Sequence, residues 1–287
     1  MSGTARILVI AGSDSGGGAG IQADIRTITM LGGHAMTAIT AVTAQNTLGV
    51  QGVHPVPADM VLKQIESVVS DIGVDAVKIG MIGSAETAEV VAEFLSSSAT
   101  SPPSSPRRRA SSISSSAEQV KRDPRLRGDD GIKEGGRIPI VFDPVMVSTS
   151  GGSLADAQTI AAFQRLMRIA TLVTPNIPEL AALGGDGIAG RYGCTVLAKG
   201  GHAEGDLLVD RLFDAGGEIA RWEDKRIGTP HTHGTGCTLA SGIAAGLGQG
   251  MALTDAIARA RRYVRAALMA APGLGGGHGP MGVPRDA

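Results

Sequence analysis

Aromatic residues, cysteine and excess charge are all scarce in this sequence. Only 2% of its 287 residues are Phe, Trp or Tyr, so the core must be built from aliphatic side chains. Two cysteines, Cys194 and Cys237, are too few for a disulfide framework, and nothing in the sequence suggests secretion. The formal net charge of −1 argues against the basic surface with which proteins bind nucleic acids or anionic membranes.

Long hydrophobic runs are missing as well. No apolar stretch reaches the length that a bilayer-spanning helix needs, and the N-terminus enters an apolar strand at Arg6 without a signal-peptide pattern. We therefore expect a cytoplasmic protein without nucleic-acid or membrane partners.

Glycine, in contrast, is abundant, with 42 residues, about twice the usual share of roughly 7%. The glycines cluster at the ends of apolar runs, where tight turns bring the backbone close to a ligand.

The apolar runs alternate between short β-branched stretches typical of buried strands and longer stretches with helical spacing. This alternation predicts an α/β fold with a mainly parallel sheet, helices on both faces, and chemistry at the carboxyl ends of the strands. We expect strands over 6–12, 35–45, 76–80, 138–142, 171–174, 195–199, 207–213 and 218–222, and helices over 20–31, 58–72, 85–95, 154–169, from 178 onward, 237–247 and 253–270.

Residues 96–137 break the alternation. They are rich in Ser, Pro and Arg, low in hydrophobicity and without periodicity, which predicts a disordered insertion in one domain that spans 1–287. A tolerated surface loop is the favoured interpretation, because long loops cost little additional closure entropy. An RNA-binding or phosphorylated arm around Arg107, Arg108 and Arg109 is the alternative.

A Gly-Thr-Gly turn, residues 234–236, stands directly before Cys237 and a run that we expect to be helical. Such a turn leaves backbone N–H groups unpaired at the positive end of the helix, which suits an incoming phosphoryl group. An ordinary strand-to-helix turn has the same sequence pattern. At a helix N-terminus the pKa of the Cys237 thiol should fall below the free value of about 8.5, which would make it a usable base or nucleophile.

A cysteine nucleophile requires a nearby base, and His231 or His233 would serve in a thiol hydrolase or acyltransferase. No surrounding sequence pattern supports that enzyme class. The hydrolase interpretation therefore stays a distant alternative, and it predicts turnover without ATP.

Charged residues follow several other predicted strands. Asp143 and Glu179 fit a hydrated Mg²⁺ held against phosphates, although each alone would also suit a turn or a helix start. Lys199 adds a point charge suited to phosphate. The glycine-rich stretch over 11–20 resembles a dinucleotide fingerprint only loosely and fits a flexible loop beside a small ligand better. Together these features favour phosphoryl transfer.

The motifs AGSDSGGGAGIQAD, TAQNTLGV, VKIGMIGS, FDPVMV, TPNIPE, AKGGH, HGTGCTLASGIAAGL and GGGHGP occur in this order. In them the sequence resembles the hydroxymethylpyrimidine/phosphomethylpyrimidine kinases of thiamine biosynthesis, over residues 6–96 and 138–281. The resemblance implies a ribokinase-like three-layer α/β fold and a homodimer. It also implies ATP- and Mg²⁺-dependent phosphorylation of 4-amino-5-hydroxymethyl-2-methylpyrimidine, first to the monophosphate and then to the diphosphate.

The resemblance also implies roles for single residues. Gln45 matches the residue that hydrogen-bonds the aminopyrimidine ring through its amide. Cys237 stands where many ribokinase-like relatives carry an aspartate base, and is expected to accept the proton of the substrate hydroxyl group. The other matching positions are Gly12, Ala19, Met81 and Val145 for the pyrimidine pocket, Gly234, Thr235 and Gly236 for the anion hole, Lys199 with Thr235 for nucleotide phosphate, and Asp143 and Glu179 for Mg²⁺.

Two further interpretations remain open. One is a pyridoxal or pyridoxine kinase on the same fold; the other is a pyrimidine-binding relative that lacks turnover. The second rests on the short crossover between Glu179 and Lys199, which we expect to hold only the short helix that begins near Pro178. His231, where an asparagine is common, is a further departure from the family pattern.

Overall fold

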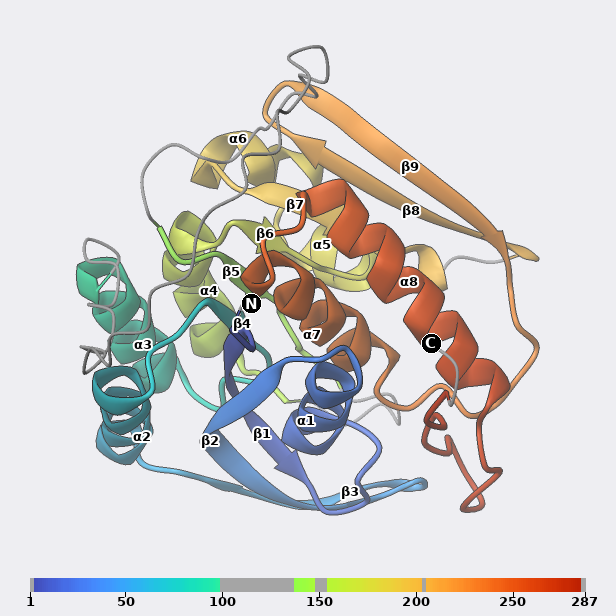
Figure 1. The fold of residues 1–287 in the computed structure, drawn as a ribbon, viewed down its shortest axis with the longest axis horizontal. Helices are drawn as coiled ribbons and strands as arrows, with labels where there is room; N and C mark the ends of the chain where they lie inside the picture. The colour runs from blue at the N-terminus through green and yellow to red at the C-terminus, as the bar shows by residue number, and fades with distance from the viewer. Residues whose placement is uncertain (1–2, 99–136, 148–153, 203–204, 285–287) are drawn as a thin grey trace, which may run out of the picture.

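The computed structural model describes residues 3–98, 137–147, 154–202 and 205–284. Within these residues nine strands form one sheet in the order β3-β2-β1-β4-β5-β6-β7-β8-β9 (Figure 1). The strands from β2 to β7 in this order pair in parallel, whereas β3, β8 and β9 pair antiparallel at the two edges. The strands are β1 (Arg6–Asp14), β2 (His34–Asn46), β3 (Gly49–Pro55), β4 (Ala76–Ile79), β5 (Ile140–Phe142), β6 (Leu172–Val173), β7 (Thr195–Ala198), β8 (Leu207–Asp214) and β9 (Gly217–Lys225).

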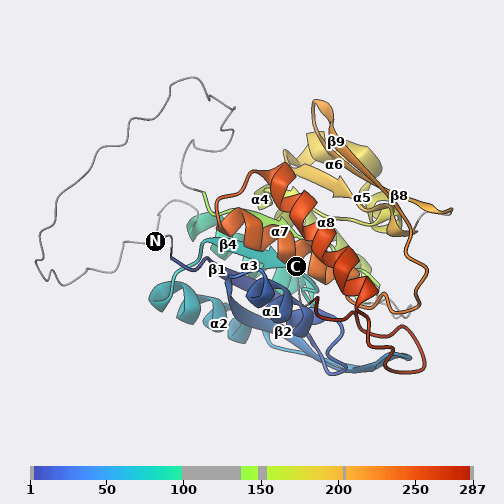
Figure 2. The same ribbon diagram turned by 45° about the vertical axis from the view of Figure 1, so that its right-hand side comes forward.

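Helices cover both faces of this sheet, as Figures 1 and 2 show. Successive residues of a strand point to opposite faces, so Leu8 and Ile10 of β1 pack with α2 to α6, while Ile7 and Val9 pack with α1, α7 and α8. The helices are α1 (Gly20–Met30), α2 (Ala58–Asp71), α3 (Ala85–Ser98), α4 (Ala157–Ile169), α5 (Ile177–Leu183), α6 (Ile188–Tyr192), α7 (Thr235–Gly248) and α8 (Leu253–Met269), with 3₁₀ turns η1 (Gly185–Gly187) and η2 (Gly200–His202).

Helices α7 and α8 lie unusually close to each other. A Cβ atom on Gly242 would lie 2.9 Å from the Cβ of Ala260, and one on Gly246 would lie 2.7 Å from the Cβ of Ala256. Only small residues at these positions permit this approach. The glycine-rich sequence of α7 therefore has a packing reason in addition to any role at its N-terminus.

The mainly parallel sheet with helices on both faces is confirmed, but three details differ from the sequence expectations. Strand β3 was not expected, because it is an exposed edge strand without an alternating apolar pattern. The expectation that the crossover after Glu179 holds only one short helix is wrong: α6 follows α5 and buries Ile188, Ala189 and Tyr192. A helix of one turn is too short to give a periodic signal.

The third difference concerns the insertion expected from residue 96. Helix α3 continues to Ser98, slightly past the expected start of the insertion near 96, and residues 99–136 lie outside the described part of the chain, so the disordered insertion stays a prediction. In the part that is described, no helix combines the length and apolar character that a membrane crossing requires.

The aliphatic core contains one aromatic pair, Phe142 of β5 and Phe163 of α4, with ring centroids 5.2 Å apart and planes at 82°. We predict that Phe163→Ala lowers the free energy of unfolding by about 3–5 kcal/mol, because it removes this contact and leaves a cavity. Urea unfolding monitored by circular dichroism measures the change. Phe94→Ala on α3, where the ring is only partly buried, is the control and should cost clearly less; equal losses would contradict the prediction.

Candidate active site

A cavity of about 990 Å³ opens along the carboxyl ends of β1, β4, β5, β6 and β7. This is the edge where a parallel α/β sheet binds ligands, because the chain leaves β1 toward β2 on one side and returns to β4 on the other. Every residue to which the family resemblance assigned a role lines this one cavity: Gly12, Ala19, Gln45, Met81, Asp143, Val145, Glu179, Lys199, Gly234, Thr235, Gly236 and Cys237. His231, considered as a base for Cys237, does not line it.

The first turn of α7 forms one wall of the cavity. Gly234 is the N-cap residue, and its φ of +85° lies in the left-handed region that disfavours side chains. A Cβ at this position would also collide with the carbonyl of Gly18, so only glycine fits here. The helix begins at Thr235, two residues before the expected start. The amide of Thr235 donates to the Thr232 carbonyl at 3.3 Å, whereas those of Gly236 and Cys237 find no acceptor among the described residues. Of the expected anion-hole residues, Thr235 thus uses its amide and Gly236 keeps its amide available, and Cys237 adds an available amide that was not expected.

Asp143 and Lys199 meet at the foot of this turn. The Nζ atom of Lys199 donates to Asp143 Oδ1 at 2.7 Å, and the hydroxyl of Thr174 donates to the same oxygen at 2.9 Å. The other oxygen, Oδ2, lies 3.4 Å from the place where a Cβ on Gly236 would stand. Burial opposes the charge of Lys199, but Asp143 and Glu179 outweigh it and raise the pKa of this ammonium group. A charged lysine therefore faces the α7 amides.

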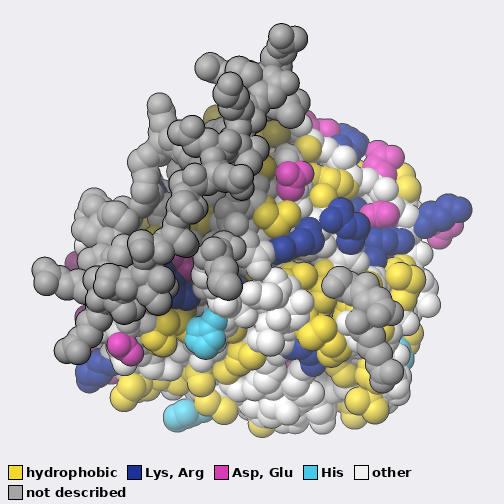
Figure 3. Space-filling view, in the orientation of Figure 1, with side chains coloured by type: hydrophobic (Ala, Val, Ile, Leu, Met, Phe, Trp, Pro, Cys, Tyr) yellow, Lys and Arg dark blue, Asp and Glu magenta, His cyan; other side chains and the backbone are white. Residues whose placement is uncertain are grey.

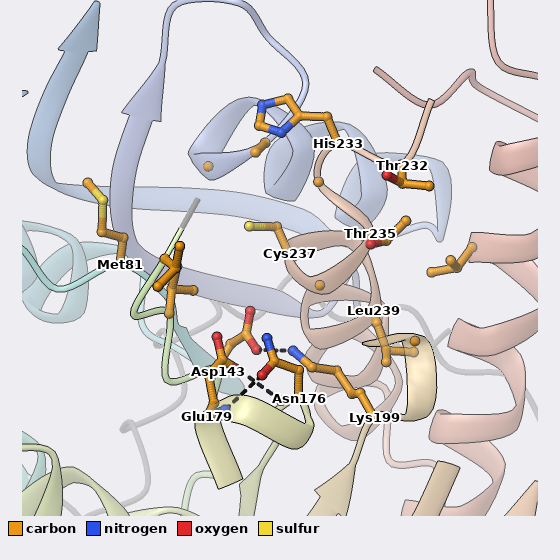
Figure 4. Close-up of a pocket in the computed structure, with 18 of the residues that line it drawn as sticks. Met81, Asp143, Asn176, Glu179, Lys199, Thr232, His233, Thr235, Cys237 and Leu239 are labelled. Atoms are coloured by element: carbon orange, nitrogen blue, oxygen red, sulfur yellow. Dashed lines mark hydrogen bonds and ion pairs between the residues drawn. The ribbon is translucent and has the colours of Figure 1, made fainter. Parts of the chain in front are cut away.

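Glu179 is held by a reciprocal capping arrangement with Asn176. The Glu179 carboxylate accepts the Asn176 amide at 2.8 Å, and the Asn176 side chain accepts the Glu179 amide at 2.8 Å. Burial raises the pKa of Glu179, Asp143 adds to this rise, and Lys199 opposes it. Figure 4 shows these four side chains grouped together below Cys237 and Thr235.

No group of three or more His, Cys, Asp or Glu side chains within the described ranges could hold a metal ion by itself. A hydrated Mg²⁺ does not require such a cage, since one or two carboxylates and substrate phosphates suffice. Asp143 and Glu179 fit that kind of site, because Asp143 Oδ2 faces the cavity beside Gly236 and makes no hydrogen bond among the described residues.

The environment of Cys237 contradicts the expected low pKa. Burial raises the pKa of its thiol to about 11; Lys78 opposes this rise, whereas Asp24 and Asp143 add to it. The amide of Gly20, at the start of α1, also stabilises the thiolate, but by less. The sequence argument considered the dipole of the helix and omitted the desolvation of the sulfur inside the site.

A fully buried ion pair lies beneath Cys237. The Nζ atom of Lys78 is 3.0 and 2.9 Å from the two carboxylate oxygens of Asp24, and Asp24 also accepts the hydroxyl of Ser241 at 2.7 Å. These contacts connect β4, α1 and α7. Only weak signals of this cluster are present in the sequence, because the lysine in VKIGM and the aspartate in IQAD stand in otherwise apolar elements.

A second polar cluster lies at the opposite end of α7's first turn. Asp14 accepts the amides of Gly16, Gly18 and Ala19, and its Oδ2 lies 2.8 Å from Nε2 of His233. Burial alone would raise the pKa of Asp14, but the bonds from His233 and the loop amides outweigh it and lower this pKa.

Gln45 of β2 joins this second cluster, with its amide 3.2 Å from the same His233 nitrogen and 3.2 Å from the hydroxyl of Thr43. His233 thus contacts Asp14 and Gln45, and within the described chain no hydrogen bond joins a histidine to Cys237. The thiol hydrolase alternative lacks its base. The sequence missed Asp14 and Thr43 because single polar residues in a loop and a strand carry no spacing pattern.

The far end of the cavity is bounded by α8 and the β8–β9 hairpin. Arg261 of α8 pairs with Asp210 of β8 and Asp224 of β9, which fixes the hairpin against the helix. Figure 3 shows basic side chains gathered over the region where α8 lies in Figure 1. The apolar residues that line this end of the cavity are Leu208, Ile227, Val264 and Leu268.

A sequence model of the family described as "Phosphomethylpyrimidine kinase" matches residues 14–103 and 129–282. The chain is 41% identical over 290 residues to the hydroxymethylpyrimidine/phosphomethylpyrimidine kinase of Streptomyces coelicolor, which covers 96% of this chain and 93% of that protein. It is 43% identical over 289 residues to the thiamine biosynthesis bifunctional protein ThiED of Geobacter sulfurreducens, covering 96% of this chain and 51% of that protein. The chain therefore spans about half the length of the Geobacter relative.

Two solved structures are similar over most of the chain. An ADP complex of Bacillus subtilis pyridoxal kinase has a TM-score of 0.76 at 27% identity and covers 98% of both chains. The phosphomethylpyrimidine kinase of Clostridium difficile 630 has a TM-score of 0.67 at 32% identity and covers 91% of this chain and 98% of that one.

The raised pKa of Cys237 gives a direct prediction for the free protein. In a Cys194→Ala background, alkylation of Cys237 by iodoacetamide should be slow at pH 7 and should rise with a midpoint near the pKa of about 11, because only the thiolate reacts. Mass spectrometry of the labelled protein over a pH series measures this, with the Cys194→Ala/Cys237→Ala variant as the blank. A midpoint at or below about 8.5, the value of a free cysteine, would contradict the burial argument.

Proposed function

Because the chain belongs to the phosphomethylpyrimidine kinase family, we propose that it transfers the γ-phosphoryl group of ATP to the hydroxymethyl group of 4-amino-5-hydroxymethyl-2-methylpyrimidine. A second transfer, to the monophosphate, gives the diphosphate used in thiamine diphosphate biosynthesis. The family, the kinase class and the ribokinase-like fold expected from the sequence are confirmed by the matches. One observation carries the proposal: the acceptor-free amides of Gly236 and Cys237 face a cavity with Gln45 at one end and Lys199 at the other.

The pyrimidine ring, the adenine base and the phosphates would each occupy a different part of the cavity. Gln45, Gly12, Ala19, Met81 and Val145 surround the pyrimidine ring in our proposal, with the amide of Gln45 facing the ring nitrogen and the exocyclic amine. The apolar end beside α8 and the β8–β9 hairpin takes the adenine base of ATP. The phosphates then lie between them, beside the first turn of α7.

The transfer itself needs positioning and charge stabilisation more than covalent chemistry. The substrate hydroxyl oxygen forms a bond to the γ-phosphorus, and the bond between that phosphorus and the β–γ bridging oxygen breaks, so ADP leaves. The amides of Gly236 and Cys237, together with Thr235, bind the oxygens of the migrating group, and Lys199 neutralises phosphate charge.

Cys237 Sγ accepts the substrate proton in this scheme, and only its thiolate form can do so. With a pKa of about 11 the thiolate is scarce at neutral pH but strongly basic. Since the transition state is loose, the hydroxyl proton leaves late, and a small thiolate fraction suffices. The raised pKa of Cys237 thus changes how it serves as a base without excluding that role.

Asp143 and Glu179 would hold Mg²⁺ beside the phosphates, where the ion would neutralise the charge that develops on the phosphate oxygens.

We further propose that the protein is a homodimer. The exposed apolar side chains of Val42, Leu48 and Val53 around the β2–β3 hairpin support this proposal. The cytoplasmic location expected from the sequence stays a prediction.

Pyridoxal kinase is a second candidate, because the Bacillus subtilis pyridoxal kinase structure has the higher TM-score of the two structures compared above. An assay that couples ADP release to NADH oxidation separates the two substrates. We predict turnover with the hydroxymethylpyrimidine and its monophosphate that depends on Mg²⁺ and exceeds turnover with pyridoxal. A clear preference for pyridoxal would reject the pyrimidine assignment, and binding of the pyrimidine without ADP release would support the non-catalytic alternative.

Replacing Cys237 tests its role in the transfer. We predict that Cys237→Ala lowers kcat by about 10²-fold, the lower end of the usual range for a general base, with little change in the dissociation constant of the pyrimidine. Steady-state kinetics and calorimetry provide the two values. Cys194→Ala, which removes the other thiol away from the cavity, is the control. Full activity of Cys237→Ala would remove this residue from the mechanism.

A further inference from the structure

Lys199 places its ammonium group beside the first turn of α7. Its Nζ atom lies 3.3 Å from the position where a Cβ on Gly236 would stand, and it donates to Asp143 Oδ1 at 2.7 Å (Figure 4). A flexible four-carbon stem joins this nitrogen to the main chain. The place of the charge therefore depends on how firmly the backbone around residue 199 is held, as well as on the ion pair at its end.

The backbone is anchored on both sides of Lys199. The Lys199 amide donates to the Pro175 carbonyl at 2.9 Å, and the Gly200 amide donates to Asp210 Oδ1 at 2.8 Å. A Cβ on Gly200 would collide with the carbonyl of Val209, so β8 lies directly against the chain where η2 begins. Asp210 thus ties the residue after Lys199 to β8.

Both carboxylate oxygens of Asp210 face hydrogen-bond donors. Oδ1 accepts the Gly200 amide, and Oδ2 pairs with Nη1 of Arg261. The exposed fractions of Asp210 and Arg261 are only 4% and 6%, so water does not readily replace a lost contact. Because both neighbours donate, the position requires two acceptor oxygens, which a carboxylate has and a carboxamide lacks. An asparagine at this position would leave one donor without a partner.

Arg261 is itself held by its neighbours. Its Nη2 donates to Asp224 Oδ2 at 2.7 Å, and its guanidinium carbon lies 5.9 Å from the ring centre of Trp222. The preceding residue of α8, Ala260, lies against Gly242 of α7. Helix α8 therefore supports β8 through Arg261 and, through close packing, also supports the helix whose first turn carries the unpaired amides (Figure 1).

We propose that Asp210, held by Arg261, is a positioning residue that fixes Lys199 at the place beside the α7 amides where a phosphate chain needs a positive charge. The proposal deepens the proposed function and rests on it where the phosphate is concerned. Asp210 acts through the lysine: without its bond to Gly200 the stem of Lys199 shifts. A shift of about 1 Å in a group that orients the substrate is enough to slow a reaction markedly.

Asp210→Asn tests this bond with the least change of shape. The charged guanidinium of Arg261 competes for the single carboxamide oxygen better than the Gly200 amide does, so Gly200 loses its acceptor. We expect kcat/KM for ATP, measured with Mg²⁺ present, to fall about tenfold, the effect of losing one hydrogen bond to a charged group. The dissociation constant of the pyrimidine should stay the same, because Gln45 lies on the other side of α7.

A double-mutant cycle with Lys199→Met shows whether Asp210 acts through the lysine. Once the ammonium group is absent, its position no longer matters, so in the Lys199→Met background Asp210→Asn should lower kcat/KM for ATP by less than about twofold. Asp224→Asn is the matched control, because it removes the other carboxylate bound to Arg261 and leaves the bond between Gly200 and Asp210 in place. It should change kcat/KM by the same factor in both backgrounds. An Asp210→Asn effect as large in Lys199→Met as in wild type would overturn the proposal.

Amide exchange in the free protein tests the anchor without ATP. In ¹⁵N-labelled protein the Gly200 amide should be protected, and it should exchange about tenfold faster in Asp210→Asn but not in Asp224→Asn. Equal exchange in wild type and Asp210→Asn would overturn the proposal, also when Lys199→Met fails to fold. Conversely, a wild-type protein that binds no ATP but shows this difference would reject the proposed function and support the anchoring by Asp210.

Discussion

The approach of the α7 N-terminus to the start of α1 is the constraint on which the site depends. Gly234 lies against the Gly18 carbonyl, in a backbone conformation that a side chain would strain. Because no side chain intervenes, two helix N-termini reach the same cavity wall, and Cys237 lies between them near the Gly20 amide. The unpaired amides of the first turn of α7, the thiol and the glycine-rich loop after β1 are brought together by this one contact.

Buried charges hold the two sides of that contact. The Lys78–Asp24 pair with Ser241 connects β4, α1 and α7 below Cys237, and the Asp14–His233 pair connects the loop after β1 to the residue before Gly234. Removing charged and polar groups from water is costly unless each is paired or hydrogen-bonded, as these are. Such pairs are geometrically demanding, so they favour one arrangement of the helices over near alternatives.

The positions of the charged groups also fit the proposed reaction, in which one end of the cavity holds the pyrimidine ring and the other holds the phosphates of ATP. Lys199, Asp143 and Glu179 stand at the ends of β5 to β7, whereas Gln45 and the loop after β1 stand at the other side of α7. The first turn of α7 lies between the two groups. In the proposed reaction, the substrate hydroxyl group and the γ-phosphate of ATP would meet beside this turn.

The sequence by itself determined the alternation of strands and helices and the sheet edge that carries the site, because periodicity and strand ends are local properties. Cavity residues such as Gln45 and Met81 were indicated by the resemblance to the family and not by a local pattern. Tertiary structure decided what no local pattern contains. Desolvation of the sulfur raises the pKa of Cys237, where the helix dipole alone predicted a fall. Likewise, α6 completes the crossover by packing three side chains from a single turn. The hydrogen-bond partners of Gln45 come from β2 and from residue 233, far away along the chain, and only folding brings them within reach.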